Sequence, residues 1–303
     1  MRSRSFAILF SLAALAACSD EFNAPEKGPI RVRVVNSVWQ LDSTGALSSA
    51  QPRAIDVYFD GSPDFGVVNV PPNSVTGTDG APDHVQLSEG VHAWSPRLSS
   101  PATPTTSLYS NTATPRGEFE PKLYFTPSTQ YTLVVAGVAP ATGRPDPGAF
   151  FVPTDFSNRM PLVEDLDPPP VTNGQRMARF RLVNAAPFAA GGSTGATIGM
   201  QLTEGSTPPT LAEINVLQSI TSATYRQQSS LTQALAYYLT VAPGDYVVNV
   251  TTGGPGGRRI LQQQAVTFEP GQVLTILVQN TAYAAVPGPA NHKITVLVDA
   301  EYE

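Results

Sequence analysis

Apolar and polar residues alternate with a period of two in several segments of the chain. Residues 31–36 are Arg-Val-Arg-Val-Val-Asn, and residues 179–184 are Arg-Phe-Arg-Leu-Val-Asn. A strand buried on one face shows this alternation, because successive side chains point to opposite faces of a sheet. We therefore expect two strands, followed by turns that open at Asn36 and Asn184. The residues expected to face a core are Val32, Val34, Phe180 and Leu182.

The same motifs occur twice in the same order, which indicates an internal duplication. Arg31 and Arg179, for example, are 148 positions apart (179 minus 31), and other pairs keep a similar separation. The paired segments are 31–36 with 179–184, 55–61 with 198–205, 68–70 with 214–216, 85–90 with 239–244, 124–135 with 267–278, and 150–156 with 294–300. The last pair aligns Asp155 with Asp299. We expect two related domains, at residues 28–160 and 176–303.

Short apolar segments separated by frequent turn residues predict the fold class. The chain contains 24 glycines and 29 prolines, which favour many short strands over long helices. We expect an all-β protein with two tandem immunoglobulin-like β-sandwich domains that follow a lipoprotein signal peptide. A chain with one cysteine cannot form the disulfide of antibody domains. The best candidate helix, residues 229–236, could equally extend the strand that contains residues 237–239.

Residues 161–175 are expected to link the two domains. Three consecutive prolines at 168–170 favour extended polyproline II geometry, which makes a semi-rigid spacer. The alternative is an edge loop within one larger domain. Residues 99–116, rich in Pro, Thr and Ser, are expected to form a surface loop of the first domain.

The first 17 residues have the features of an export signal. Two arginines precede an apolar stretch at residues 6–15, which is too short to span a bilayer. The following Leu-Ala-Ala-Cys resembles the bacterial lipobox, which implies lipidation of Cys18, with residues 18–27 as a tether. The alternative is an ordinary secretory signal with a stray core cysteine. Ser19 after the cysteine implies sorting to the outer membrane, facing either the periplasm or the cell surface.

Several motifs resemble a family of bacterial envelope proteins known as the domain of unknown function 4397. Residues 32–36 and 56–61 (Asp-Val-Tyr-Phe-Asp-Gly) carry the resemblance in the first copy, and residues 184–187 and 242–246 carry it in the second. The resemblance implies an immunoglobulin-like sandwich and a lipoprotein or surface location, without an established activity or cofactor. The second copy departs from the pattern, with Gly-Met-Gln at 199–201 in place of Asp-Val-Tyr.

Composition and charge exclude one class of function. The net charge is −6 and only 14% of residues are charged. Nucleic-acid binding requires clustered Lys and Arg, so we expect no nucleic-acid partner. Attachment to a membrane would have to come from the lipid at Cys18.

Candidate catalytic and metal residues are few. Ser193 lies in Gly-Gly-Ser-Thr-Gly and is followed by Asp245 and His292, in the order of a serine hydrolase. That motif needs a strand-to-helix turn, whereas a flexible loop is expected here, so a hydrolase is a remote alternative. His84 and His92 are the candidate zinc pair, against surface histidines. We expect no catalytic residue, metal or cofactor.

Trp39 and Trp94 are the candidate sugar-stacking residues, although such residues more often fill a core or its rim. The sequence thus favours a non-catalytic envelope lipoprotein that is structural or binds an envelope protein. The alternative is a surface carbohydrate-binding module.

Overall fold

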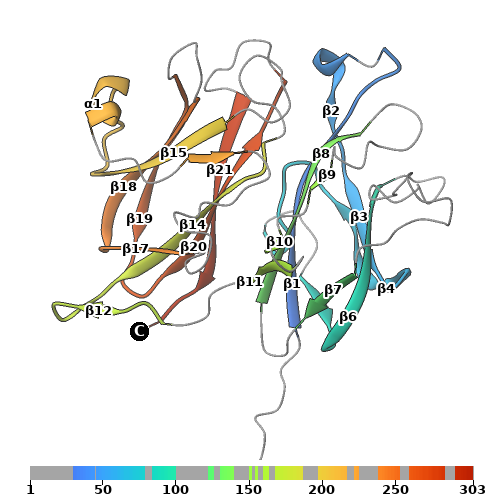
Figure 1. Cartoon of the computed structure of the whole chain (residues 1–303). Coiled ribbons are helices and arrows are strands. Elements are labelled where there is room, and N and C mark those ends of the chain that lie inside the picture. Colours follow the sequence, from blue (N-terminus) through green and yellow to red (C-terminus); the bar gives the residue numbers. More distant parts are fainter. Residues whose placement is uncertain are drawn as a thin grey trace, which may run out of the picture.

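The computed structural model consists almost entirely of β-strands, arranged as two sandwiches side by side (Figure 1). The helical elements in the described part of the chain are α1 (Leu211–Val216) and the short 3-10 helix η1 (Leu47–Ser49). The expected all-β fold is therefore confirmed. The structure describes residues 30–44, 46–78, 84–99, 122–125, 130–139, 150–151, 154–155, 160–163, 168–186, 197–216, 222–224, 238–252, 259–283 and 291–302.

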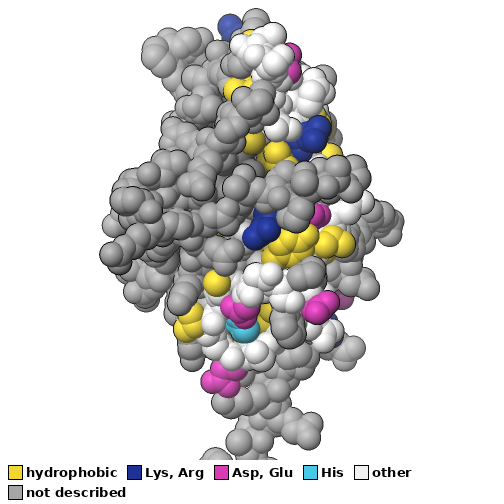
Figure 2. Space-filling model, turned by 90° about the vertical axis from the view of Figure 1, so that its right-hand side faces the viewer, with side chains coloured by type: hydrophobic (Ala, Val, Ile, Leu, Met, Phe, Trp, Pro, Cys, Tyr) yellow, Lys and Arg dark blue, Asp and Glu magenta, His cyan; other side chains and the backbone are white. Residues whose placement is uncertain are grey.

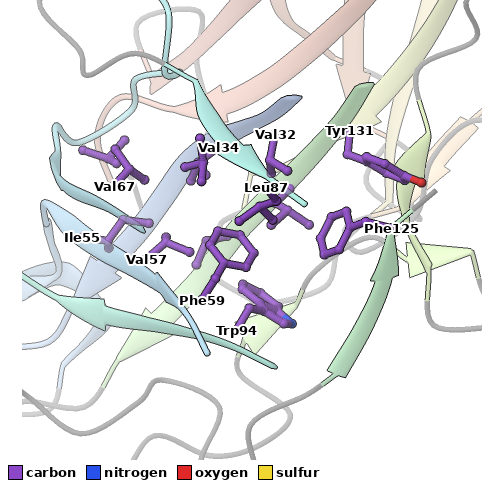
Figure 3. Close-up of a cluster of buried hydrophobic side chains, with 14 of the residues drawn as sticks. Val32, Val34, Ile55, Val57, Phe59, Val67, Leu87, Trp94, Phe125 and Tyr131 are labelled. Atoms are coloured by element: carbon purple, nitrogen blue, oxygen red, sulfur yellow. The ribbon is translucent and has the colours of Figure 1, made fainter. Parts of the chain in front are cut away.

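The first sandwich has two sheets with a shared apolar core, drawn in Figure 3. One sheet contains β1 (Ile30–Gln40), β2 (Gln51–Pro52), β5 (Val85–Leu87), β8 (Gln130–Ala139), β9 (Phe150–Phe151), β10 (Thr154–Asp155) and β11 (Met160–Val163). The other sheet contains β3 (Ile55–Phe59), β4 (Ser62–Val70), β6 (Gly90–Leu98) and β7 (Lys122–Phe125). Alternate residues of β1 and β3 point into this core, as the period-two pattern predicts.

The second sandwich repeats this plan. One sheet contains β14 (Ala178–Asn184), β17 (Leu239–Val241), β20 (Val273–Asn280) and β21 (His292–Ala300). The other contains β15 (Thr197–Glu204), β16 (Ser222–Thr224), β18 (Gly244–Thr252) and β19 (Ile260–Phe268). In both sandwiches the first strand pairs in parallel with a later strand, β1 with β8 and β14 with β20. The antiparallel neighbours, β5 and β17, also correspond.

Two of the expected correspondences differ from the structure. Residues 68–70 belong to strand β4, whereas residues 214–216 form the end of helix α1, so this pairing is wrong. Short apolar runs without clear periodicity suit either a strand or a helix. The alignment of Asp155 with Asp299 is also wrong. Asp299 lies on β21, directly beside β20, whereas Asp155 lies on β10, which β11 separates from β8.

The expected linker at residues 161–175 contains regular structure. Residues 161–163 belong to β11, which pairs with β8 of the first sandwich. Further along, β12 (Val171–Thr172) and β13 (Gln175–Arg176) form a hairpin. Its turn residues, Asn173 and Gly174, have φ values of 52° and 77°, and positive φ at both central positions is typical of tight hairpin turns. The spacer is therefore shorter than the sequence suggested.

Asn36 does not open a turn. Strand β1 continues past it to Gln40, and the Asn36 side chain is fully buried. Its Nδ2 donates to the backbone oxygens of Arg53 at 2.8 Å and of Val70 at 3.0 Å. The amide thereby ties β1 to the segments that precede β3 and end β4. The second copy follows the expectation more closely, because β14 ends at Asn184.

Candidate functional site

The described residues form an interface between the two sandwiches that contains buried apolar, polar and charged side chains. Strands β8 and β20 are buried along almost their whole length, because one face packs on the strand's own core and the other on the opposite sandwich. An apolar cluster spans the interface. Its members are Val35, Val75, Val134, Ala136, Val183, Ala185, Leu277 and Leu297.

A buried ion pair lies in the same interface. Arg33 Nη1, on β1, donates to Asp299 Oδ1, on β21, at 2.8 Å, and Arg33 Nη2 donates to the backbone oxygen of Val298 at 3.1 Å. The exposed fraction is 6% for both charged residues. Asp299 Oδ2 accepts from Tyr238 Oη at 2.7 Å and from Thr275 Oγ1. This carboxylate therefore has partners on both oxygens.

Arg181 is the second cation of this polar cluster, and it corresponds to Arg33 in the duplication. It is fully buried on β14, with its guanidinium 4.8 Å from the centre of the Tyr238 ring. Its Nε donates to Thr275 Oγ1 at 2.7 Å, and its Nη2 donates across the interface to Thr132 Oγ1 at 3.4 Å. Burial of a cation is costly unless its donors find acceptors. Stacking on an aromatic ring adds to that compensation.

The Tyr238 hydroxyl is held in its neutral form. Burial is the largest cause of its raised pKa, and the Asp299 carboxylate raises it further through charge and through the hydrogen bond. The charge of the Arg181 guanidinium lowers the pKa of Tyr238, but this effect is smaller than that of burial. A tyrosine with so high a pKa keeps its proton at neutral pH. It serves as a permanent donor to Asp299 and not as a general base.

Two further hydrogen bonds cross the interface, and one of them joins equivalent positions of the two copies. Ser37 Oγ on β1 donates to the backbone oxygen of Ala185 at 2.6 Å, and Gln279 Nε2 on β20 donates to the backbone oxygen of Asn36 at 3.0 Å. Ser37 and Ala185 are 148 positions apart, the same separation as Arg33 and Arg181. Facing strands of the two copies thus meet at equivalent positions and run in the same direction.

A second apolar contact joins the sandwiches further along β1. It contains Trp39 and Ala50 of the first sandwich together with Tyr283, which follows β20. Partly buried Leu41 and Val138 complete it. The interface therefore extends from Arg33 near one end of β1 to Trp39 near the other.

Both candidate sugar-stacking residues are buried, as expected of residues that fill a core or its rim, and the stacking alternative is not supported. The exposed fraction is 1% for Trp39 and 1% for Trp94. Figure 3 shows Trp94 beneath Phe59, inside the core of the first sandwich. A stacking platform needs an exposed ring face, which neither residue offers. Trp94 fills the core of the first sandwich, and Trp39 packs in the contact between the sandwiches.

Two residues of the hydrolase alternative, Asp245 and His292, lie in the described part of the chain. Ser193 lies outside the described residues, and so does Cys18, the expected lipidation site. Asp245 lies on β18 and accepts from Thr267 Oγ1 at 2.7 Å. His292 lies on β21, in the other sheet of the sandwich, where Nε2 is 3.3 Å from Asn280 Nδ2. These contacts hold strands together.

The histidines of the candidate zinc pair have separate surroundings. His92 Nδ1 is 2.6 Å from Asp60 Oδ2, and its Nε2 is 2.9 Å from the backbone oxygen of Ser88. The ring of His84 packs on Gly77, where an added Cβ would lie 2.3 Å from it. Within the described ranges, no three His, Cys, Asp or Glu residues are grouped to hold a metal. The same part of the chain has no helix long and apolar enough to cross a membrane.

The Asp-Val-Tyr-Phe-Asp-Gly motif has a structural role. Asp56 Oδ1 accepts the backbone N–H of Asn69 at 2.7 Å, where β4 departs from regular pairing. Asp60 and Gly61 form the two-residue turn of the β3–β4 hairpin, with φ values of 52° and 71°. Asp60 Oδ1 also accepts from the backbone N–H of Ala93 at 2.9 Å. The contacts of Asp56 and Asp60 thus shape one hairpin.

Sequence reasoning missed the polar cluster of Arg33, Arg181, Tyr238, Thr275 and Asp299. Two features of the sequence bear on it. Arginine occurs at equivalent alternate positions in both copies, and the segments 131–135 and 273–278 are apolar at nearly every position. Continuous apolar runs are typical of strands buried on both faces, which requires something to cover the outer face.

Exposed apolar residues on the described surface are scattered. Figure 2 shows small groups of hydrophobic side chains between polar and charged ones on one face of the molecule. The large apolar residues with the most exposure lie on four different strands, at Val68, Val91, Val171 and Val298. Isolated exposed apolar residues are ordinary on a protein surface and do not define a binding patch.

No protein-family model and no curated protein matches the chain. A candidate cell adhesion protein from Bacteroides eggerthii aligns over 91% of this chain and 96% of its own, with 9% identity and a TM-score of 0.21. One from Bacteroides fragilis aligns over 91% and 99%, with 9% identity and a TM-score of 0.22. One from Bacteroides ovatus aligns over 89% and 96%, with 10% identity and a TM-score of 0.21. The all-β fold is shown by the strand pairing within the chain itself.

Proposed function

We propose that this chain is a non-catalytic lipoprotein of the cell envelope that serves as a rigid structural or protein-binding module. The observation that carries the proposal is the ion pair between Arg33 and Asp299, buried between the two sandwiches. Separating such a pair would leave charges without compensation, so the sandwiches resist moving apart. A rigid two-domain body suits a protein that holds a partner at a fixed position.

The membrane attachment in this proposal is the lipid on Cys18. Its support is the sequence Leu-Ala-Ala-Cys at residues 15–18, which resembles a lipobox and contains the chain's one cysteine. Several acyl chains at one residue give stable anchoring, whereas one chain gives marginal binding. Ser19 favours the outer membrane as the destination. Membership of the domain of unknown function 4397 family stays a prediction from the motifs quoted above.

The strand register suggests which end of the body would face a partner. Arg31, at the start of β1, pairs with Gln130 at the start of β8. Val163, at the end of β11, pairs with Tyr131 beside it. In the second sandwich, Val273 pairs with residues at both the start of β14 and the end of β21. The chain thus enters and leaves each sandwich at the same end. An anchor before β1 leaves the opposite end free for a partner.

The non-catalytic part of the proposal rests on what the candidate residues do. Among the described residues, Asp245 and His292 make contacts between strands, and Asp56 and Asp60 shape a hairpin. A carbohydrate-binding module that uses Trp39 or Trp94 is not favoured, because both rings are buried.

Fatty-acid labelling and protease treatment of intact cells test the proposal. We expect a clickable palmitate analogue to label the wild-type protein, and the Cys18→Ala variant to remain unlabelled and to be lost from the membrane fraction. An equally labelled and equally membrane-bound variant would contradict the anchor. Digestion on intact cells would assign the cell surface, whereas digestion only after lysis would assign the periplasm.

A further inference from the structure

Strand β1 is held along both of its edges. On one edge it pairs in parallel with β8 through ten register positions, from Arg31 opposite Gln130 to Gln40 opposite Ala139. On the other edge it pairs in turn with β5, with a bridge at Val75 and with β2. Nearly the whole strand therefore has hydrogen-bonded neighbours on both sides.

Both faces of β1 are also covered. Alternate residues, including Val32 and Val34, pack in the core of the first sandwich. The residues between them face the second sandwich, where Arg33 binds Asp299 and Ser37 donates to the Ala185 backbone oxygen. Within the described part of the chain, β1 thus has neighbours on both edges and on both faces.

The direction of β1 determines how it would respond to tension. A lipid at Cys18 would pull on the strand at Ile30, along the strand axis and away from the opposite end. A partner held at that opposite end would pull the remainder of the molecule the other way. The two strands are then loaded in shear. All ten positions of the parallel ladder share the force, because it acts along the strand axes. Pulling both strands from the same end would instead break the pairs one at a time.

We propose that β1 is a load-bearing strand that resists tension between the N-terminal anchor and a partner at the far end of the molecule. This function rests on the anchored module proposed above and adds mechanical resistance to it. The β1–β8 ladder carries the load within the first sandwich. The contacts of Arg33 and Ser37 transfer part of it to the second sandwich.

Single-molecule pulling on the unacylated chain from Cys18 to Glu303 tests this inference. One handle is attached to the native Cys18, the only cysteine. The second is attached to an introduced cysteine, either Ala282→Cys after the end of β20 or Gln130→Cys at the start of β8. The first geometry loads β1 along its length, whereas the second peels it from β8.

At the same constant load, we expect the Ala282→Cys protein to stay folded at least about tenfold longer than the Gln130→Cys protein. This ratio corresponds to a barrier difference of about 1.4 kcal/mol. Equal lifetimes, or a longer lifetime in the peeling geometry, would overturn the inference. Because no acyl chain is present, the result is independent of lipidation in cells. Failure of the anchor would appear only in the labelling experiment.

The contribution of the second sandwich to resisting the load is tested in the Ala282→Cys protein. Asp299→Asn should shorten the lifetime under load, because Arg33 loses its charged partner. Asp245→Asn is the matched control, since that carboxylate bonds Thr267 within the second sandwich. Should Asp299→Asn fail to fold, Ser37→Ala removes a different interface bond with a smaller change. Lifetimes equal to that of the control would overturn the load transfer.

Discussion

Arg33 and Asp299 are 266 positions apart in the sequence and form an ion pair of 2.8 Å between the two sandwiches. One is on the first described strand and the other is near the end of the last. The pair is buried, so its Coulomb attraction must offset the loss of hydration of both groups. Tyr238 and Thr275 donate to the same carboxylate and help to satisfy it. These contacts stabilise the relative orientation of the two copies.

Removing one partner of this pair should be strongly destabilising. Asp299→Ala leaves the buried Arg33 without its carboxylate, and loss of one partner of a buried pair costs about 3–5 kcal/mol. Denaturant unfolding should show this loss in the free energy of unfolding. The control Asp245→Ala removes a carboxylate from an exposed hydrogen bond, and its effect should stay below about 1 kcal/mol. Similar losses in both variants would contradict a buried ion pair.

Replacement of Trp94 tests its role as a core residue. Trp94→Ala removes a side chain with an exposed fraction of 1%, and such truncations cost about 3–5 kcal/mol. Val91→Ala, on the same strand, has an exposed fraction of 59% and should cost less than about 0.5 kcal/mol. Thermal or denaturant unfolding checks both. A Trp94→Ala protein of wild-type stability that lost retention on a polysaccharide column would instead support sugar stacking.

Stability should decline at alkaline pH through Tyr238. Its pKa is raised in the folded protein, first by burial, above the value of about 10 in an unfolded chain. The unfolded state therefore loses this proton first as the pH rises. The contribution is fully present below pH of about 10 and is lost progressively above it. Tyr238→Phe should show a smaller decline in the free energy of unfolding between neutral and alkaline pH. Parallel curves for the two proteins would contradict this prediction.

Two glycines of the β3–β4 hairpin should differ in their tolerance of alanine. Gly61 has a φ of +71° with no atom within 4 Å of an added Cβ, so Gly61→Ala meets only backbone strain of about 1–2 kcal/mol. At Gly66 an added Cβ would lie 2.5 Å from the backbone oxygen of Val57. Since backbone must shift there, Gly66→Ala should be the more destabilising of the two in denaturant unfolding. The reverse order would show that the close approach at Gly66 is absent.

The fold could be predicted where a local pattern has a single structural meaning. Alternation at residues 31–36 and 179–184 specifies half-buried strands, and both are strands in the structure. The glycines at 90 and 244 mark the junctions of β5 with β6 and of β17 with β18. Residues 214–216 were misassigned because a segment of three residues is too short to distinguish the period of a strand from that of a helix.

The interface could not be predicted because it joins positions that are distant in sequence. Nothing near Arg33 indicates that its partner is Asp299, since the pairing depends on how two complete sandwiches pack. The role of Trp39 stayed open between two alternatives for the same reason. An aromatic residue suits an exposed platform or a buried contact, and Tyr283 of the other sandwich decides between them by covering it.

Differential scanning calorimetry of the mature, unacylated protein tests most directly whether the two sandwiches form one body. We predict one transition, with a calorimetric enthalpy equal to the van't Hoff enthalpy, because the interface couples the unfolding of both copies. Two separate transitions, or a calorimetric enthalpy about twice the van't Hoff value, would show that the sandwiches unfold independently. That result would contradict the rigid module on which the proposed function depends.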